Sequence, residues 1–244
     1  MQTAGVSAPL EIRIDRKVFR SADGTPVTAI EGLRLTLETG GLTAVIGPSG
    51  CGKSTMLRIL GGLDHAYEGR LDLPPDLRIG YVFQEPRLLP WRTVEANVRL
   101  VLRRQENADP TSLFESLGLS DMRQRFPTEL SLGLARRVAI ARALVIEPNL
   151  LLLDEPSTSL DETTAQRLRA LILDIWTTRR TTTLLVTHNV REAIALATRL
   201  VLLAPRPSHV LADIPLALPQ DQRDETWIEA KRSELIALYP GIVA

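Results

Sequence analysis

Short apolar runs alternate with helical patterns along most of the chain. Runs with the length and composition of buried strands cover residues 43–46, 79–83, 150–153, 181–187 and 199–204. Between them, apolar residues recur at helical spacing, for example Ala165, Leu168, Ile172 and Ile175 behind a capping Asp161. This alternation predicts an α/β fold whose buried strands share one sheet.

The N-terminal region follows a different period. Residues 10–14 and 33–37 alternate between apolar and polar side chains, and the turn signal Asp23-Gly24-Thr25-Pro26 lies between them. This pattern predicts an antiparallel sheet, with a further strand near residues 71–73. Phe19 follows the first predicted strand, where a free ring could stack on a purine. A simple core or turn phenylalanine explains the residue equally well at this point.

Residues 92–147 have helical character. Thr93 is placed to cap a first helix that reaches Val101 or Leu102, Gly118 closes a second, and Ser131 is placed to cap a third. We expect a helical lobe with arginines on its polar faces. One domain, 1–244, is therefore predicted, with a core of 10–91 and 148–204, an inserted lobe of 92–147, and a C-terminal strand and helix in 205–244.

Composition narrows the class of protein. The chain has 244 residues, 44% of them hydrophobic and only 4% aromatic, and its 29 basic and 29 acidic residues give no net charge. Balanced charge offers no argument for nucleic acid as a partner. The lone cysteine, Cys51, excludes an internal disulfide and favours a reducing compartment. Because no apolar run approaches the roughly 18 residues of a membrane span, we expect any membrane role to depend on a partner.

One segment fits the phosphate-loop pattern G-x-x-x-x-G-K-[ST] without a gap. Its residues are Gly47, Pro48, Ser49, Gly50, Cys51, Gly52, Lys53, Ser54 and Thr55. A predicted strand precedes it and a helix closed by Gly61-Gly62 follows, so backbone N–H groups and a helix N-terminus can surround phosphate oxygens. Lys53 is expected to neutralise β- and γ-phosphate charge and Ser54 to bind Mg²⁺. Cys51 is expected to contribute only its backbone.

Polar side chains lie at the ends of other predicted strands. Asp154 and Glu155 end one strand, Gln84 another, and His188 a third. Because parallel strands present functional groups at one edge of a sheet, we expect Asp154 to hold Mg²⁺ and Glu155 to orient the attacking water. Gln84 could bind Mg²⁺ and touch that water, and His188 could reach the γ-phosphate.

A second phosphate-facing surface is predicted at residues 130–134. There, Ser131 and Gly133 stand at the start of a predicted helix, where a hydroxyl and a backbone N–H can meet an anion.

These segments resemble, in identity and order, the motifs of ATP-binding-cassette (ABC) ATPases. The resemblance covers essentially residues 10–240. Its motifs, in chain order, are Walker A (47–55), the Q-loop (84), the signature (130–134), Walker B (150–155), the D-loop (159–161) and the switch histidine (188). The resemblance implies a phosphate-loop NTPase core and a homodimer with ATP between the two copies. It places Ser131, Gly133 and Asp161 at the nucleotide and gives Phe19 the position of the adenine-stacking aromatic.

The segment 82–91 is similar to the Q-loop of importers for nitrate, taurine and other sulfonates, and 204–207 also resembles that group. The resemblance implies an ATPase on the cytoplasmic side of the inner membrane. Its expected partners are permease subunits, which residues 84–91 and 92–147 would contact, and indirectly a solute-binding protein. Nitrate, a sulfonate, cyanate and a pyrimidine precursor are all open as the solute.

The signature departs from the family pattern, because Leu132 replaces a glycine, Leu134 ends the motif, and Ala135 stands where a basic residue is common. Either the backbone still adopts the required turn and activity is only tuned, or dimer closure is impaired. The second hypothesis leads to an alternative function, a regulatory or non-transport module with weakened hydrolysis. A cassette ATPase acting on nucleic acid would leave the balanced charge unexplained. A small-molecule kinase would not explain the combination of motifs.

Overall fold

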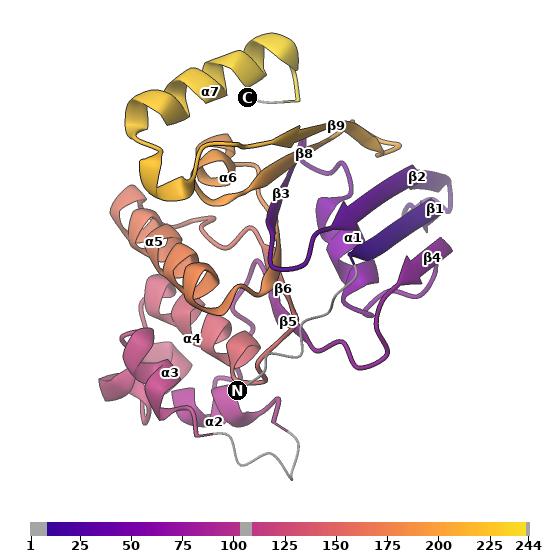
Figure 1. Ribbon diagram of the computed structural model, residues 1–244. Coiled ribbons are helices and arrows are strands. Elements are labelled where there is room, and N and C mark those ends of the chain that lie inside the picture. The colour runs from indigo at the N-terminus through magenta and orange to yellow at the C-terminus, as the bar shows by residue number, and fades with distance from the viewer. Residues whose placement is uncertain (1–8, 103–108, 243–244) are drawn as a thin grey trace. The chain divides into compact units, whose positions relative to one another are not determined.

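A computed structural model describes residues 9–102 and 109–242 (Figure 1). The described chain divides into two compact units. Unit 1 consists of the residues up to 75 together with those from 182 onward, and unit 2 consists of Asp76–Thr181. The division into a core, a lobe and an extension at 91/92, 147/148 and 204/205 stays a prediction.

The predicted antiparallel sheet is present in unit 1. Its strands are β1 (Leu10–Arg20), β2 (Pro26–Leu37) and β4 (Glu68–Asp72), with β1 in the centre. Alternate residues of β1 are buried, as the sequence pattern predicts. The prediction that Phe19 follows the first strand is wrong. The strand continues to Arg20 because β2 pairs with its full length, and Phe19 lies opposite Val27.

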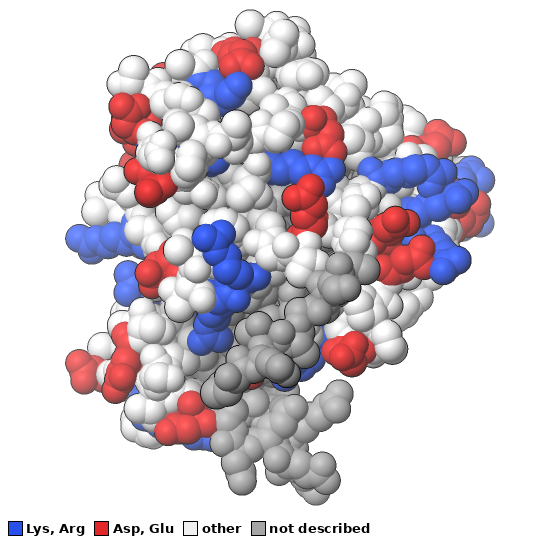
Figure 2. All heavy atoms as spheres, viewed as in Figure 1, with Lys and Arg blue, Asp and Glu red and all other residues white. Residues whose placement is uncertain are grey.

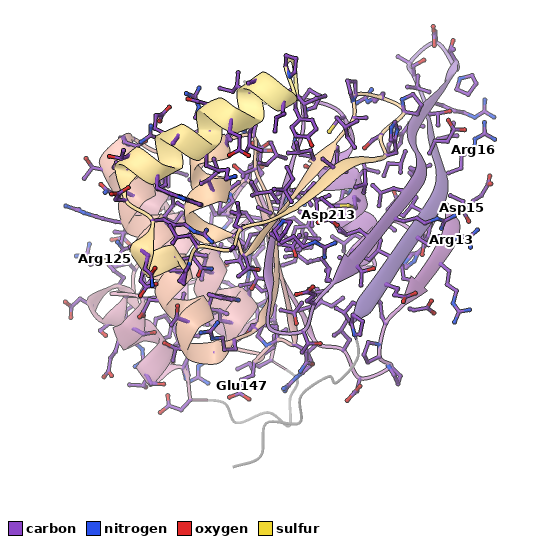
Figure 3. The ribbon with its side chains drawn as sticks, turned by 45° about the horizontal axis from the view of Figure 1, so that its top comes forward. Arg13, Asp15, Arg16, Arg125, Glu147 and Asp213 are labelled. Carbon is purple, nitrogen blue, oxygen red and sulfur yellow. The ribbon has the colours of Figure 1, made fainter. Side chains whose placement is uncertain are left out.

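The outer face of this sheet carries a row of arginines, in which Arg13 lies opposite both Arg34 and Arg70. Like charges in register destabilise a sheet, but here carboxylates offset them. Asp15 accepts hydrogen bonds from Arg13 (2.8 Å) and Arg34 (3.4 Å), and Asp72 accepts one from Arg70 (2.5 Å). The bond from Arg13 lowers the pKa of Asp15. Figure 3 shows Arg13 and Asp15 side by side, and Figure 2 shows acidic and basic groups interspersed.

Unit 1 also contains a buried parallel sheet. Its central strand β3 (Leu42–Ile46) pairs in parallel with β7 (Thr182–Val186) and β8 (Arg199–Leu203), and β9 (Val210–Pro215) runs antiparallel to β8. Every residue of β3 and β7 is buried, as is typical of strands inside a parallel sheet. The helices of this unit are α1 (Lys53–Leu60), α6 (Val190–Leu196) and α7 (Glu225–Leu238). In Figure 1, α6 packs on β3 and α7 packs on α6.

Unit 2 combines two parallel strands with helices. Strands β5 (Ile79–Val82) and β6 (Leu150–Asp154) pair, and α4 (Leu132–Leu144) packs on β5. The remaining helices are α2 (Val94–Arg99), α3 (Thr111–Ser116), α5 (Glu162–Arg179) and the short turns Ser120–Met122 and Pro127–Glu129. Helix α2 ends at Arg99, with Leu100 as its C-cap. The prediction that this helix reaches Val101 or Leu102 is therefore wrong.

The predicted N-caps are confirmed. Thr93, Ser131 and Asp161 accept hydrogen bonds from the backbone N–H of the third following residue, at 3.2, 3.3 and 2.9 Å. The prediction that arginines occupy polar faces is wrong for two of them, because Arg136 and Arg142 of α4 are buried. Their guanidinium groups donate to carbonyl oxygens of neighbouring loops. No helix of residues 9–102 and 109–242 could cross a membrane.

Candidate functional site

The phosphate loop in unit 1 joins β3 to α1. Gly50 and Gly52 have φ values of 75° and 115°, and Gly52 is the residue that directly precedes the helix. Only glycine adopts these angles without strain. A side chain at Gly47 would lie 2.9 Å from Sγ of Cys51 and 3.1 Å from the Leu203 carbonyl oxygen. The glycine positions of the motif are therefore required by the backbone of this loop.

Lys53 begins α1 and turns back over the loop. Its Nζ donates to the carbonyl oxygens of Gly47 (2.7 Å) and Pro48 (3.1 Å), and the residue is only 5% exposed. Ser54, the next residue, is exposed. A lysine ammonium and a hydroxyl thus stand at a helix N-terminus, an arrangement suited to bind a phosphate group.

Cys51 is buried beneath the loop. Burial raises the pKa of its thiol, against the opposing charge of Lys53. A buried thiol with a raised pKa is a poor nucleophile, which supports the expectation that Cys51 contributes its backbone.

Sequence reasoning missed a segment that holds the outside of this loop. Arg206 donates through Nε to the Gly50 carbonyl oxygen. Because a trans peptide is planar, this turns the Cys51 N–H to the opposite side, where Pro48 accepts it at 3.2 Å. Ser208 then fixes the same segment to β2, through backbone bonds with Ala29 (2.9 Å) and Glu31 (3.0 Å). A proline-flanked arginine in the 204–207 motif was the available signal.

Phe19 and His188 are the other predicted site residues of unit 1. Phe19 is 43% exposed, and Nζ of Lys17 lies 4.7 Å from the centre of its ring. His188 is exposed and follows β7. The residues on either side of it are fixed: Thr187 donates to Glu192 (2.6 Å) and accepts from the N–H of Asn189 (3.0 Å).

Unit 2 brings together three other predicted residues. Asp154 ends β6, is buried, and accepts a hydrogen bond from Tyr81 (3.4 Å). Glu155 follows with φ of 45°, an unusual angle for a residue with a side chain. Its Oε2 accepts from Thr158 Oγ1 at 2.9 Å and from Gln84 Nε2 at 3.4 Å. Within this unit Gln84 therefore contacts Glu155, which directly follows Asp154 at the end of β6.

Two arginines of α4, which sequence reasoning placed on polar faces, hold the loop that carries Gln84. Arg136 donates to the carbonyl oxygens of Gln84 and of Phe83 (3.3 Å), and Arg142 donates to those of Pro86 (2.7 Å) and Arg87 (2.8 Å). Arg136 also reaches the Thr158 carbonyl oxygen (3.1 Å). A helical pattern alone does not reveal this, since both arginines also fit a solvated helix face.

The signature segment forms the first turn of α4. Ser131 caps the helix and is exposed, and Leu132 is 40% exposed. A side chain at Gly133 would come within 2.7 Å of Cγ2 of Thr164, so glycine lets α4 approach α5. Asp161 uses its carboxylate to cap α5, and the bond from Thr164 lowers the pKa of Asp161. The substitution at Leu132 does not prevent the helix N-terminus from forming.

No group of three His, Cys, Asp or Glu side chains in residues 9–102 and 109–242 is placed to hold a metal ion.

Comparison with known proteins identifies the family. Residues 30–158 match the family model described as ABC transporter. The chain belongs to the ABC transporter family. Among relatives of this ABC chain, the aliphatic sulfonates import ATP-binding protein SsuB 2 of Burkholderia cenocepacia is 40% identical over 97% of this chain and 90% of its own length. The SsuB protein of Bacillus licheniformis is 42% identical over 86% of each chain.

Solved ABC structures share the fold. The dimeric post-hydrolysis state of the cassette MJ0796, bound to ADP and Pi, matches with a TM-score of 0.73 and 27% identity over 86% of this chain and 100% of that one. CbiO1 of Clostridium perfringens, part of an ABC transporter complex, matches in fold with a TM-score of 0.71 and 23% identity over 95% of each chain. The predicted α/β cassette fold and ATPase function are confirmed. The alternative of a regulatory module finds no support.

Proposed function

We propose that this chain is the ATP-hydrolysing subunit of an importer for aliphatic sulfonates or a closely related small anion. The observation that carries this proposal is the identity of about 40% with sulfonate import ATP-binding proteins over nearly the whole chain. The 82–91 segment, similar to importers for nitrate, taurine and other sulfonates, supports the same class of solute.

The active form in this proposal is a homodimer. Each ATP lies between residues 47–55 of one copy and Ser131 with Gly133 of the other, with Asp161 nearby. Support comes from the dimeric form of the related cassette MJ0796 and from the intact helix N-terminus at Ser131. Because a lone phosphate loop leaves the γ-phosphate half covered, two copies account for both anion-binding surfaces.

In this proposal the predicted site residues have separate roles in ATP binding and hydrolysis. Backbone N–H groups of residues 47–55 and the Lys53 ammonium bind the β- and γ-phosphates, while Phe19 stacks on adenine. Glu155 orients and polarises the attacking water, with Gln84 beside it. His188 contacts the γ-phosphate as charge develops there.

Mg²⁺ fits the donors that the chain offers. Ser54 supplies a hydroxyl, Gln84 an amide oxygen and Asp154 a carboxylate, all hard oxygen ligands of the kind Mg²⁺ prefers. Few protein carboxylates are needed, because this ion usually completes its shell with substrate phosphates and water. Bound Mg²⁺ would offset phosphate charge.

The permease is proposed to dock on unit 2. This unit has a cavity of about 300 Å³, whose lining includes Tyr81, Phe83, Leu100, Val101 and Arg142. Trp91, in the 82–91 segment of the same unit, is 71% exposed, and an exposed indole is typical of a protein contact. Docking places the subunit on the cytoplasmic side of the inner membrane, and a solute-binding protein acts on it only through the permease.

For the signature segment we adopt the first hypothesis, in which Leu132 changes the rate of ATP hydrolysis but does not abolish it. The test is ATP turnover of the wild type and of Leu132→Gly, each assembled with its permease in vesicles and supplied with binding protein. We expect turnover in both, stimulated by alkanesulfonates more than by nitrate. A wild type that binds ATP without turnover would contradict the proposal, and stimulation by nitrate alone would correct only the solute.

A further inference from the structure

The guanidinium group of Arg136 connects the two residues that hold the carboxylate of Glu155. Two side chains hold Oε2 of Glu155: the hydroxyl of Thr158 at 2.9 Å and the amide of Gln84 at 3.4 Å. Arg136 holds the backbone of both these residues, through the Gln84 carbonyl oxygen and the Thr158 carbonyl oxygen at 3.1 Å. Both bonds come from one planar group, so they fix the spacing between the two loops.

The arrangement is costly, because Arg136 is only 3% exposed and its partners are neutral carbonyl groups. Its Nε has no hydrogen-bond partner among the described residues. Burial lowers the pKa of Arg136, while the charges of Glu85 and Glu155 oppose that shift. A buried cation without a bonded carboxylate lowers stability, so stability alone does not account for this arginine.

Glu155 needs such support. Its φ of 45° and that of Ser159, 65°, lie in the left-handed region. Residues with side chains stay there only when surrounding contacts impose the conformation. Arg136 binds Thr158, which lies between them in the chain.

We propose that Arg136 is the positioning residue of Glu155 and sets the direction of the carboxylate that orients the attacking water. This inference rests on the proposed role of Glu155. In this proposal Arg136 acts through Thr158 and Gln84, whose carbonyl oxygens it holds. It also links the 83–87 loop, where the permease is proposed to dock, to the residues that follow Glu155.

The test is a kinetic comparison in the assembled transporter. Arg136→Met removes every donor, and we expect kcat to fall about 10- to 100-fold, the range that a misplaced catalytic group produces. The Kd for ATP should stay within about twofold, because the hydrogen bonds of Arg136 hold the loops around Glu155, which is proposed to act in hydrolysis and not in ATP binding. Arg137→Met is the matched control: it removes the neighbouring arginine of α4, whose guanidinium donates to the Leu117 carbonyl oxygen (3.3 Å) instead of the Gln84 loop, and kcat should change less than about threefold.

A double-mutant cycle with Thr158→Val separates positioning from general damage. If Arg136 acts through Thr158, the kcat loss of the double variant is far smaller than the product of the single losses. Independent losses, or an Arg136→Met enzyme with normal kcat, would overturn the inference. If Arg136→Met does not fold, Thr158→Val alone must still lower kcat with unchanged Kd. Absence of turnover in the wild type would instead count against the proposed function.

Discussion

The phosphate loop of unit 1 and the Glu155 segment of unit 2 both use left-handed backbone, but with different residues. In the phosphate loop these positions are Gly50 and Gly52, with φ of 75° and 115°. In and around the Glu155 segment they are Arg87, Glu155 and Ser159, with φ of 47°, 45° and 65°. Glycine adopts such angles freely, whereas a residue with a side chain loses about 1–2 kcal/mol.

The difference shows where each conformation comes from. The loop of unit 1 is encoded locally, by glycine and by the helix start that follows it. The segment of unit 2 is imposed by distant residues, because Arg136 and Arg142 of α4 hold the backbone around it. ATP binding should therefore respond to changes in the loop itself, and turnover should respond to loss of the arginines of α4 that hold the Glu155 segment.

Lys53→Ala is expected to have the largest effect. It removes the ammonium that we propose binds the phosphates, and a lost charge-assisted contact of about 2–3 kcal/mol weakens ATP binding about 30- to 150-fold. Equilibrium binding of a fluorescent ATP analogue measures this. Arg70→Ala is the charge-matched control, since the exposed side chain of Arg70 bonds Asp72 on the antiparallel sheet. Equal ATP affinity of Lys53→Ala and wild type would contradict the account in which the phosphate loop of unit 1 determines ATP binding.

Gly50→Ala tests the locally encoded conformation. Alanine strains φ of 75°, and its Cβ would lie 3.3 Å from Arg206. A cost of about 1–2 kcal/mol predicts ATP affinity about 5- to 30-fold weaker, measured by the same titration. Unchanged affinity would mean that the bound loop does not need this angle.

Arg206→Ala should weaken ATP affinity about two- to fivefold, the loss expected for one hydrogen bond that orients a peptide. Isothermal titration with ATP and with AMP checks the site of action, because in the proposed site the β- and γ-phosphates, which AMP lacks, occupy the loop. Arg206→Lys keeps a donor and should recover part of the affinity. Equal losses for ATP and AMP would place the effect elsewhere.

Glu147→Gly gives the smallest effect and isolates the strain. Glu147 follows α4 with φ of 48° and is exposed (Figure 3). Glycine there should raise the free energy of unfolding by about 0.5–1 kcal/mol. The same substitution at Glu115, inside α3, should lower it by about 1 kcal/mol. Thermal unfolding of the two variants compares them, and matching shifts of the same sign would refute the strain argument.

Sequence reasoning identified the residues of the phosphate loop because glycine, lysine and serine at fixed spacing encode it. It also found the caps Thr93, Ser131 and Asp161, whose hydrogen bonds are local. It missed the roles of Arg136 and Arg206, because each bonds carbonyl groups far away in the chain, 52 residues for Arg136 and 156 for Arg206. Backbone acceptors carry no sequence signal, so such contacts need a structure.

The central claim is that unit 1 binds ATP and Glu155 of unit 2 drives its hydrolysis. Glu155→Gln tests it most directly, through size-exclusion chromatography with and without ATP together with turnover of the same sample. The account predicts ATP affinity close to wild type, turnover reduced at least about 100-fold, and a dimer that appears only with ATP. Wild-type turnover in this variant would contradict it.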